Sequence, residues 1–311
     1  MSRLVFFGNE RLATSVATTA PTLQALLSAG YDVVAVVIAQ GAATKSRTSR
    51  PLEVALLAKA HGIPVLMPSK LSEITDELKT YEAEAGVLVA FGKLVPQAVI
   101  DIFPKGIVNI HPSLLPAHRG SIPIEAAMLQ GDAETGVSLM QLVREMDAGP
   151  VFAQSKVTLS GTETKQELAD QLLKLGKTML LEHLPAILDG SLEPQPQSDY
   201  AATYDQRLAK DAGVLAQDDW NRPAADIERM VLALAGWPRV RTQLAVIDII
   251  ITAAHAVPAI AGASGAPGAL WTEGNQFGVY AKDSILIIDR LLPAGKKEMS
   301  AQAFLAGYKL N

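Results

Sequence analysis

The chain has 311 residues, of which 49% are hydrophobic and 19% charged, and its formal net charge is −5 at pH 7. These values exclude a disordered chain and a strongly basic nucleic-acid coat protein, and the length is sufficient for two domains. The absence of cysteine excludes disulfides, thiolate metal sites and a cysteine nucleophile. No segment has the pattern of a signal peptide or a membrane span, so we expect a cytoplasmic protein.

The first 189 residues alternate between short apolar runs and helical segments. Strands are predicted at 3–7, 32–39, 63–68, 85–92 and 106–111, with helices at 20–30, 51–62 and 71–82 between them. Two further strands, 136–143 and 150–159, precede a helix at 163–188. Strands that alternate with helices are typical of βαβ units. We therefore expect an α/β fold with a doubly wound, mostly parallel sheet.

The pattern changes after residue 189. The segment 190–206 is polar and contains prolines, which is typical of a linker. A helix is predicted at 223–235, followed by apolar strands at 244–251, 274–281 and 284–293 without helices between them. Short strands of this kind favour a small β-barrel. The predicted domains are thus 1–189 and 207–311, joined by 190–206.

The stretch "VNIHP" places two polar side chains at the end of an apolar strand. Residues two apart in a strand face the same side, so Asn109 and His111 project together while Val108 and Ile110 face the other way. Pro112 ends the strand. Ligands of doubly wound sheets bind at the carboxyl ends of the strands, where an amide can donate to an oxyanion and an imidazole can carry a proton. The plainer alternative is a buried polar pair that bonds the following turn.

A further polar group follows in "MDAGPVF", between two predicted strands. Asp147 lies there in an Asp-x-Gly turn. A carboxylate from this turn is able to orient the imidazole of His111, as acids do in other histidine-centred sites. A simple turn is the alternative interpretation of the same residues.

Residues 91–152 resemble the folate-dependent formyltransferases. The shared pattern is Asn-x-His at a strand end, then Ser-Leu-Leu-Pro and Arg-Gly, then an Asp-x-Gly loop. The resemblance implies 10-formyltetrahydrofolate as formyl donor, Asn109 as oxyanion donor, His111 as proton carrier and Asp147 as the residue that orients His111. It also implies a folate wall made of Phe91, Gly92, Leu94, Ser113, Leu114, Leu115 and Pro116. No group of histidines and acids has metal-ligand spacing, so we expect no metal.

The C-terminal part is similar to the branch of this family that formylates methionyl initiator tRNA in translation initiation. The similar segments are 203–220, 236–242 and 291–307, which in that branch belong to an OB-like barrel domain that helps hold the tRNA. The basic loop 44–51 carries Lys45, Arg47 and Arg50 without an acid, and charge and resemblance together predict contacts to the tRNA phosphates. We expect a monomer with methionyl initiator tRNA as partner.

One segment departs from the family pattern. The family has Gly-Thr-Pro after the first strand, whereas residues 9–21 form a longer and different connection here, so no site residue is assigned in it. His118 is also given no role. Three alternatives stay open: a nucleotide-linked amino sugar as acceptor, water as acceptor in a deformylating hydrolase, and a non-catalytic RNA-binding protein on the same scaffold.

Overall fold

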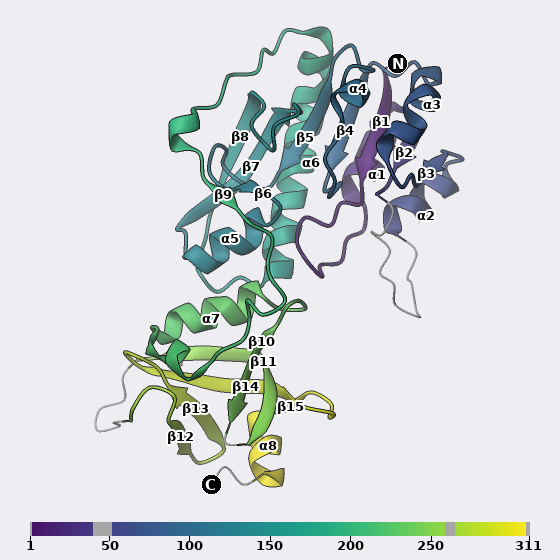
Figure 1. Ribbon diagram of the computed structural model, residues 1–311. Helices are drawn as coiled ribbons and strands as arrows, with labels where there is room; N and C mark the ends of the chain where they lie inside the picture. The colour runs from purple at the N-terminus through teal and green to yellow at the C-terminus, as the bar shows by residue number, and fades with distance from the viewer. Residues whose placement is uncertain (1, 40–51, 245, 259–264, 309–311) are drawn as a thin grey trace. The chain divides into compact units, whose positions relative to one another are not determined.

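The computed structural model describes residues 2–39, 52–244, 246–258 and 265–308 (Figure 1). The chain forms two compact units. The first comprises Met1–Ile124, Glu134–Thr158 and Gln166–Arg207, and the second comprises Glu125–Ala133, Leu159–Lys165 and Leu208–Asn311. No helix among the described residues is long and apolar enough to cross a membrane.

The first unit is built on a seven-stranded sheet with the order β3-β2-β1-β4-β5-β7-β8. Its strands are β1 (Arg3–Gly8), β2 (Asp32–Val37), β3 (Val65–Leu66), β4 (Ala85–Val89), β5 (Ile107–His111), β7 (Glu134–Gln141) and β8 (Val151–Thr158). The pairs from β3 to β5 are parallel, and β7 is antiparallel to both of its neighbours. The order reverses between β1 and β4, which is the switch point of a doubly wound sheet. The predicted α/β fold is confirmed.

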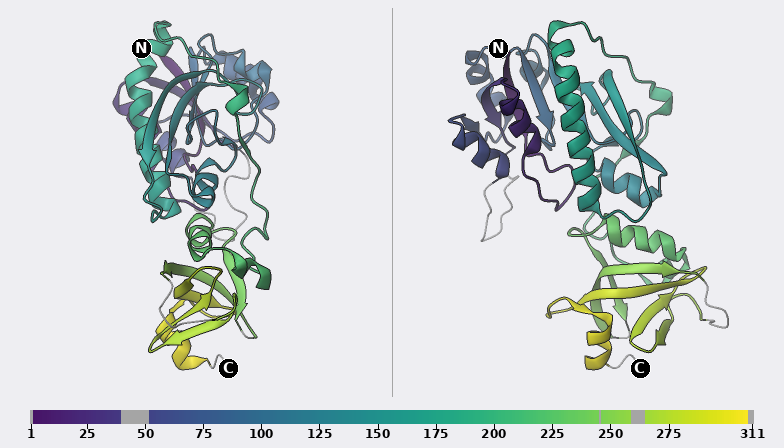
Figure 2. Two further views of the ribbon diagram at one scale, coloured as in Figure 1. Left: turned by 90° about the vertical axis from the view of Figure 1, so that its left-hand side faces the viewer. Right: turned by 180° about the vertical axis from the view of Figure 1, so that it is seen from behind.

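Helices connect these strands, and one more follows β8. They are α1 (Pro21–Ser28), α2 (Glu53–Ala60), α3 (Thr75–Thr80) after the 3₁₀ turn η1 (Leu71–Ile74), α4 (Gln97–Ile100), α5 (Pro123–Gln130) and α6 (Lys165–Asp189). Figure 2 shows α6 lying lengthwise over one face of the sheet. A Cβ atom on Gly176 of α6 would lie 2.5 Å from Cγ2 of Ile110, so this glycine allows the helix to approach β5 closely. The strand that carries Asn109 and His111 is therefore held from behind by α6.

Replacing Gly176 by Leu is expected to lower the free energy of unfolding by about 1–3 kcal/mol, because the added side chain overpacks the contact with Ile110. Urea unfolding measures the change. The control is Gln171→Leu on an exposed position of the same helix, which leaves the unfolding midpoint nearly unchanged. Equal midpoints for the two variants would contradict the close contact.

The second unit contains a six-stranded antiparallel sheet. Its order is β10-β11-β14-β13-β12, with β15 paired to β14. The strands are β10 (Val240–Leu244), β11 (Ile247–Val257), β12 (Leu270–Glu273), β13 (Gln276–Tyr280), β14 (Ile285–Pro293) and β15 (Met299–Ser300), and the helices are η3 (Gln217–Asn221), α7 (Ala224–Ala233) and α8 (Ala301–Gly307). Its core contains Trp220, Ile227, Phe277 and Phe304. This is the predicted small β domain.

One predicted strand in this unit has wrong bounds. The run 244–251 is divided by a hairpin, since Leu244 at the end of β10 pairs with Ile247 at the start of β11. Val246 at the turn is 89% exposed. The turn escapes a pattern-based prediction because this run contains no glycine, proline or asparagine and both halves are equally apolar.

The segment 190–206, predicted as a linker, is structured within the first unit. Gln195 pairs with Val151, and β9 (Tyr204–Asp205) pairs in parallel with β6 (Arg119–Gly120) after the short turn η2 (Asp199–Ala201). Some polar side chains of this segment, such as those of Gln197 and Asp199, bond other protein groups. We call residues 195–205 the return segment, because they bring the chain back to the sheet.

Candidate active site

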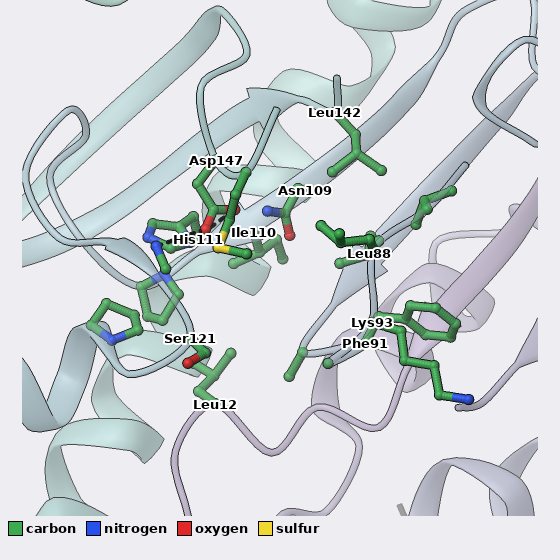
Figure 3. A pocket seen from close by; sticks show the side chains of 18 of the residues that line it. Leu12, Leu88, Phe91, Lys93, Asn109, Ile110, His111, Ser121, Leu142 and Asp147 are labelled. Carbon is green, nitrogen blue, oxygen red and sulfur yellow. Dashed lines mark hydrogen bonds and ion pairs between the residues drawn. The ribbon is translucent and has the colours of Figure 1, made fainter. Parts of the chain in front are cut away.

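A cleft of about 630 Å³ lies at the carboxyl ends of the central strands (Figure 3). Its walls come from the segments that follow β1, β4 and β5, which meet at this edge because these parallel strands end there, and from the loop after the antiparallel β7, which carries Asp147. Figure 3 shows Leu88 and Leu142 beside the amide of Asn109, with His111 and Asp147 further along the cleft. The cleft thus joins an apolar region to a group of polar side chains.

Asn109 and His111 emerge side by side from the end of β5, as the alternation predicts. Asn109 is only 6% exposed and His111 only 4% exposed, and both residues line the cleft. Among the described residues, the side-chain amide of Asn109 makes no hydrogen bond with protein. A buried amide without a protein partner is costly, since buried polar groups in native proteins are normally paired. This amide is therefore available to a ligand in the cleft.

His111 and Asp147 approach each other without a hydrogen bond. The distance from His111 Nδ1 to Asp147 Oδ1 is 3.7 Å, which is an ion-pair distance when the imidazole is protonated. The other oxygen, Oδ2, accepts a hydrogen bond of 2.9 Å from the backbone N–H of Gly120. Asp147 itself has a left-handed backbone, with φ 50°. The carboxylate is held by backbone geometry and by Gly120, and its other oxygen, Oδ1, faces the imidazole.

The tautomer of His111 follows from its other nitrogen. Nε2 lies 2.9 Å from the carbonyl oxygen of His118. A carbonyl oxygen only accepts, so Nε2 carries a proton in this contact. Nδ1 is then the nitrogen that gains or loses a proton, and it is the one beside Asp147. The pair is arranged to carry a proton at Nδ1 and to stabilise the imidazolium with a carboxylate.

The return segment fixes the loop that bears Asp147. The side-chain amide of Gln197 donates to the carbonyl oxygens of Asp147 at 2.8 Å and Gly149 at 2.6 Å. Its Oε1 accepts from Nε of the buried Arg119 at 3.1 Å. Sequence reasoning missed Gln197, because a polar, proline-containing segment gives no local sign of a long-range contact.

Three of the predicted folate-wall residues line the cleft. Phe91 is buried and packs edge-on against Phe7, with ring centroids 5.9 Å apart, while Leu94 is 66% exposed. Gly92 has φ +74°, a left-handed backbone that favours glycine, and no atom lies within 4 Å of the place of a Cβ. The backbone of the turn after β4 thus explains a glycine at this position, whether or not a ligand binds there.

Ser113, Leu114, Leu115 and Pro116 do not line this cleft. The Ser113 hydroxyl donates to the carbonyl of Ala117 at 2.7 Å, and its own carbonyl accepts from the Ser138 hydroxyl at 2.7 Å. The N–H of Leu115 donates to that same hydroxyl at 3.0 Å, and Leu114 packs against Gly136 of β7. The four residues shape the turn that follows His111, because their polar groups bond within that turn and to side chains of β7 and β8.

The unusual segment after β1 forms part of the cleft wall. Asn9, Arg11 and Leu12 line it, although the sequence analysis assigned no residue there. The segment is fixed by the buried Glu10, whose carboxylate accepts from the backbone N–H groups of Thr22 and Leu23 at 2.8 and 2.9 Å. Glu10 thus satisfies free N–H groups at the start of α1. The connection lacks apolar periodicity, so its place is seen only from long-range contacts such as this one and the ion pair of Arg11 with Glu53.

Burial raises the pKa of Glu10 above its usual value of 4.5, although the hydrogen bonds from Leu23 and Thr22 act in the opposite direction. The native state therefore binds this proton more tightly than the unfolded chain. The resulting stabilisation is complete below pH 4.5 and is lost as the pH rises through the folded pKa. Glu10→Gln has no such loss, so its unfolding free energy relative to the natural chain is expected to increase from about pH 4 to about pH 8. Urea unfolding at several pH values checks this, and a difference independent of pH would contradict it.

Lys45, Arg47 and Arg50 lie outside the described residues, so their contacts with tRNA stay a prediction from the sequence. No group of three or more His, Cys, Asp or Glu side chains within the part of the chain that the structure describes is placed to hold a metal ion.

Comparison with known proteins gives a consistent result over both units. Residues 4–184 match the family described as Formyl transferase, and residues 216–309 match Formyl transferase, C-terminal domain. A chain from Pelobacter propionicus named methionyl-tRNA formyltransferase is 37% identical over 313 residues, covering 98% of this chain and 92% of that one. A chain of the same name from Myxococcus xanthus is 37% identical over 315 residues, covering 99% and 96%.

Solved structures share the fold. The N-formyltransferase from Helicobacter canadensis, in complex with folinic acid and dTDP-3-aminofucose, has a TM-score of 0.68 at 17% sequence identity. The match covers 96% of this chain and all of that chain. Because the sequence identity is only 17%, this similarity shows that the two proteins share a fold.

Proposed function

The chain belongs to the formyl transferase family, and on this premise we propose that it transfers a formyl group from 10-formyltetrahydrofolate to the α-amine of methionyl initiator tRNA. The observation that carries this proposal is 37% identity over 98% of the chain to a methionyl-tRNA formyltransferase, with both units included. The reaction belongs to translation initiation in the cytoplasm, and the protein acts as a monomer.

The cleft fits a folate co-substrate. A pterin is flat and largely apolar on its faces, and Leu88, Phe91 and Leu142 offer an apolar wall of matching kind. The amide of Asn109, which makes no hydrogen bond to the residues that the structure describes, lies at the edge of this wall, where the formyl group must meet the amine. When bound, 10-formyltetrahydrofolate supplies the formyl group as an activated amide.

Asn109, His111 and Asp147 each have a separate role in the reaction. The methionyl amine attacks the formyl carbon, and Asn109 donates its amide N–H to the oxyanion that develops. His111 carries the proton at Nδ1 from the amine towards the departing folate nitrogen. Asp147, 3.7 Å from that nitrogen, stabilises the imidazolium while it carries the proton. The amine loses one proton and the folate nitrogen gains one, so the transfer balances.

A direct assay tests the proposal. The purified chain and 10-formyltetrahydrofolate are incubated in parallel with methionyl initiator tRNA, methionyl elongator tRNA and a nucleotide-linked amino sugar. Formylation of the initiator tRNA is the expected result. Formylation of the sugar alone would instead assign the amino-sugar acceptor, and release of formate without an acceptor would assign a hydrolase.

A further inference from the structure

A second buried histidine–acid pair is linked to the candidate active site through the backbone of His118. His118 Nδ1 is 2.7 Å from Asp205 Oδ2, and the two side chains are 9% and 10% exposed. The partners are 87 residues apart in sequence, His118 in the turn after β5 and Asp205 in the return segment. The proposed mechanism uses neither side chain, and a carboxylate buried beside an imidazole needs a physical explanation because burying a charged group is costly.

The backbone of His118 connects this pair to His111. Its carbonyl oxygen is the acceptor of the Nε2 proton of His111 at 2.9 Å. His118 has a left-handed backbone, with φ 58°, which is uncommon for residues other than glycine, although histidine adopts it more often than most. Such a conformation persists only where surrounding contacts enforce it.

Those contacts come from the return segment. The N–H of His118 donates to Thr203 Oγ1 at 2.8 Å, and the N–H of Arg119 donates to the Thr203 carbonyl at 2.9 Å. The backbones of β6 and β9 are so close that a Cβ on Gly120 would lie 2.5 Å from the carbonyl oxygen of Asp205. The side chain of His118 is thus anchored at one point and its peptide at another, and its carbonyl points at His111.

We infer that the His118–Asp205 pair positions His111 for catalysis. The pair holds the His118 carbonyl in the place where its oxygen accepts the Nε2 proton of His111. Nδ1 of His111 is then the nitrogen that faces Asp147. The inference rests on the proposed function for its kinetic consequence. The tautomer of His111 is a separate property that requires no substrate. Both residues of the pair are positioning residues, since they act through the His118 carbonyl.

Three variants of the full-length chain test the kinetic consequence. Asp205→Ala removes the anchor, and kcat is expected to fall about 10-fold to 100-fold with KM for the folate nearly unchanged, since small displacements of a catalytic group cost this much. Asp205→Asn keeps an oxygen acceptor for His118 Nδ1–H and is expected to restore most of kcat. Asp199→Ala is the matched control, because Asp199 lies in the same segment but bonds Arg119 with a side chain that is 87% exposed. It is expected to keep kcat within about 2-fold.

The ring nitrogens of His111 give a readout independent of activity. Selective ¹⁵N labelling of the five histidines separates protonated from bare ring nitrogens, and His111→Asn identifies the signals of His111. The natural chain and Asp199→Ala are expected to show His111 protonated at Nε2, and Asp205→Ala a mixture of the two neutral tautomers. If Asp205→Ala does not fold, the same spectra are recorded for His118→Asn, because asparagine tolerates the left-handed backbone at this position. They then show whether the tautomer of His111 changes when the pair is lost.

Two results would overturn the inference. One is an unchanged His111 tautomer in folded Asp205→Ala or His118→Asn. The other is equal kcat for Asp205→Ala and Asp199→Ala in the formyl-transfer assay. If no acceptor is formylated by the natural chain, the proposed function fails instead, and the tautomer spectra still test the positioning role.

Discussion

Replacing Asp147 by Asn is expected to lower kcat by about 10²–10⁴-fold, the range that a positioned acid–base group contributes. Asn keeps an oxygen to accept the N–H of Gly120, so the loop retains its shape. What is lost is the negative charge 3.7 Å from His111 Nδ1, and with it the stabilisation of the imidazolium during proton transfer. The rate of methionyl-tRNA formylation at saturating substrates measures the effect.

The control for this prediction is Glu145→Gln, which removes an exposed carboxylate from the same loop. Its kcat is expected to stay within about threefold of the natural value, because exposed charges interact weakly in water. A comparable loss in both variants would mean that net charge at the cleft, and not the pair with His111, controls the rate. Normal turnover of Asp147→Asn would remove Asp147 from the mechanism.

Replacing Asn109 by Ala is expected to lower kcat by about 10²–10³-fold, the usual cost of one oxyanion donor. The side-chain amide makes no hydrogen bond within the described protein, so its removal leaves no protein group unpaired. The unfolding temperature should therefore change little while turnover collapses. KM for the tRNA should also change little, because the oxyanion forms only in the transition state.

Thermal unfolding and single-turnover formylation separate the two possible roles of Asn109. A stable variant with slow chemistry supports the oxyanion role. A variant with normal single-turnover rates, or one that loses activity only in proportion to folded protein, would show that Asn109 has a structural part instead. The assignment of Asn109 and that of Asp147 can fail separately, since the first concerns the oxyanion and the second the proton.

Local sequence patterns predicted the scaffold well. Proline and glycine marked the limits of α1, and β-branched runs marked the parallel strands. The alternation of β5 placed Asn109 and His111 on one face, because the direction of side chains along a strand is a property of the backbone itself. Where local marks were absent, prediction failed: the hairpin at Val246 lies in an unbroken apolar run.

Other features were decided only by the tertiary structure. Ser113, Leu114, Leu115 and Pro116 match a family motif, yet their polar groups serve the turn. Ser138 on a different strand bonds the carbonyl of Ser113 and the N–H of Leu115. The segment 9–21 became a cleft wall through the contact of Glu10 with the start of α1.

The sequence by itself determined which side chains reach the end of β5 and which chemistry they can perform. The tertiary structure decided which nitrogen of His111 carries the proton and what holds Asp147, through contacts from His118, Gln197 and Asp205. Gln197 and Asp205 lie in a polar stretch whose composition is that of a linker. The physical reason is that side-chain direction repeats every two residues along a strand, whereas a hydrogen bond between residues 50 or 87 positions apart exists only after the chain has folded back on itself.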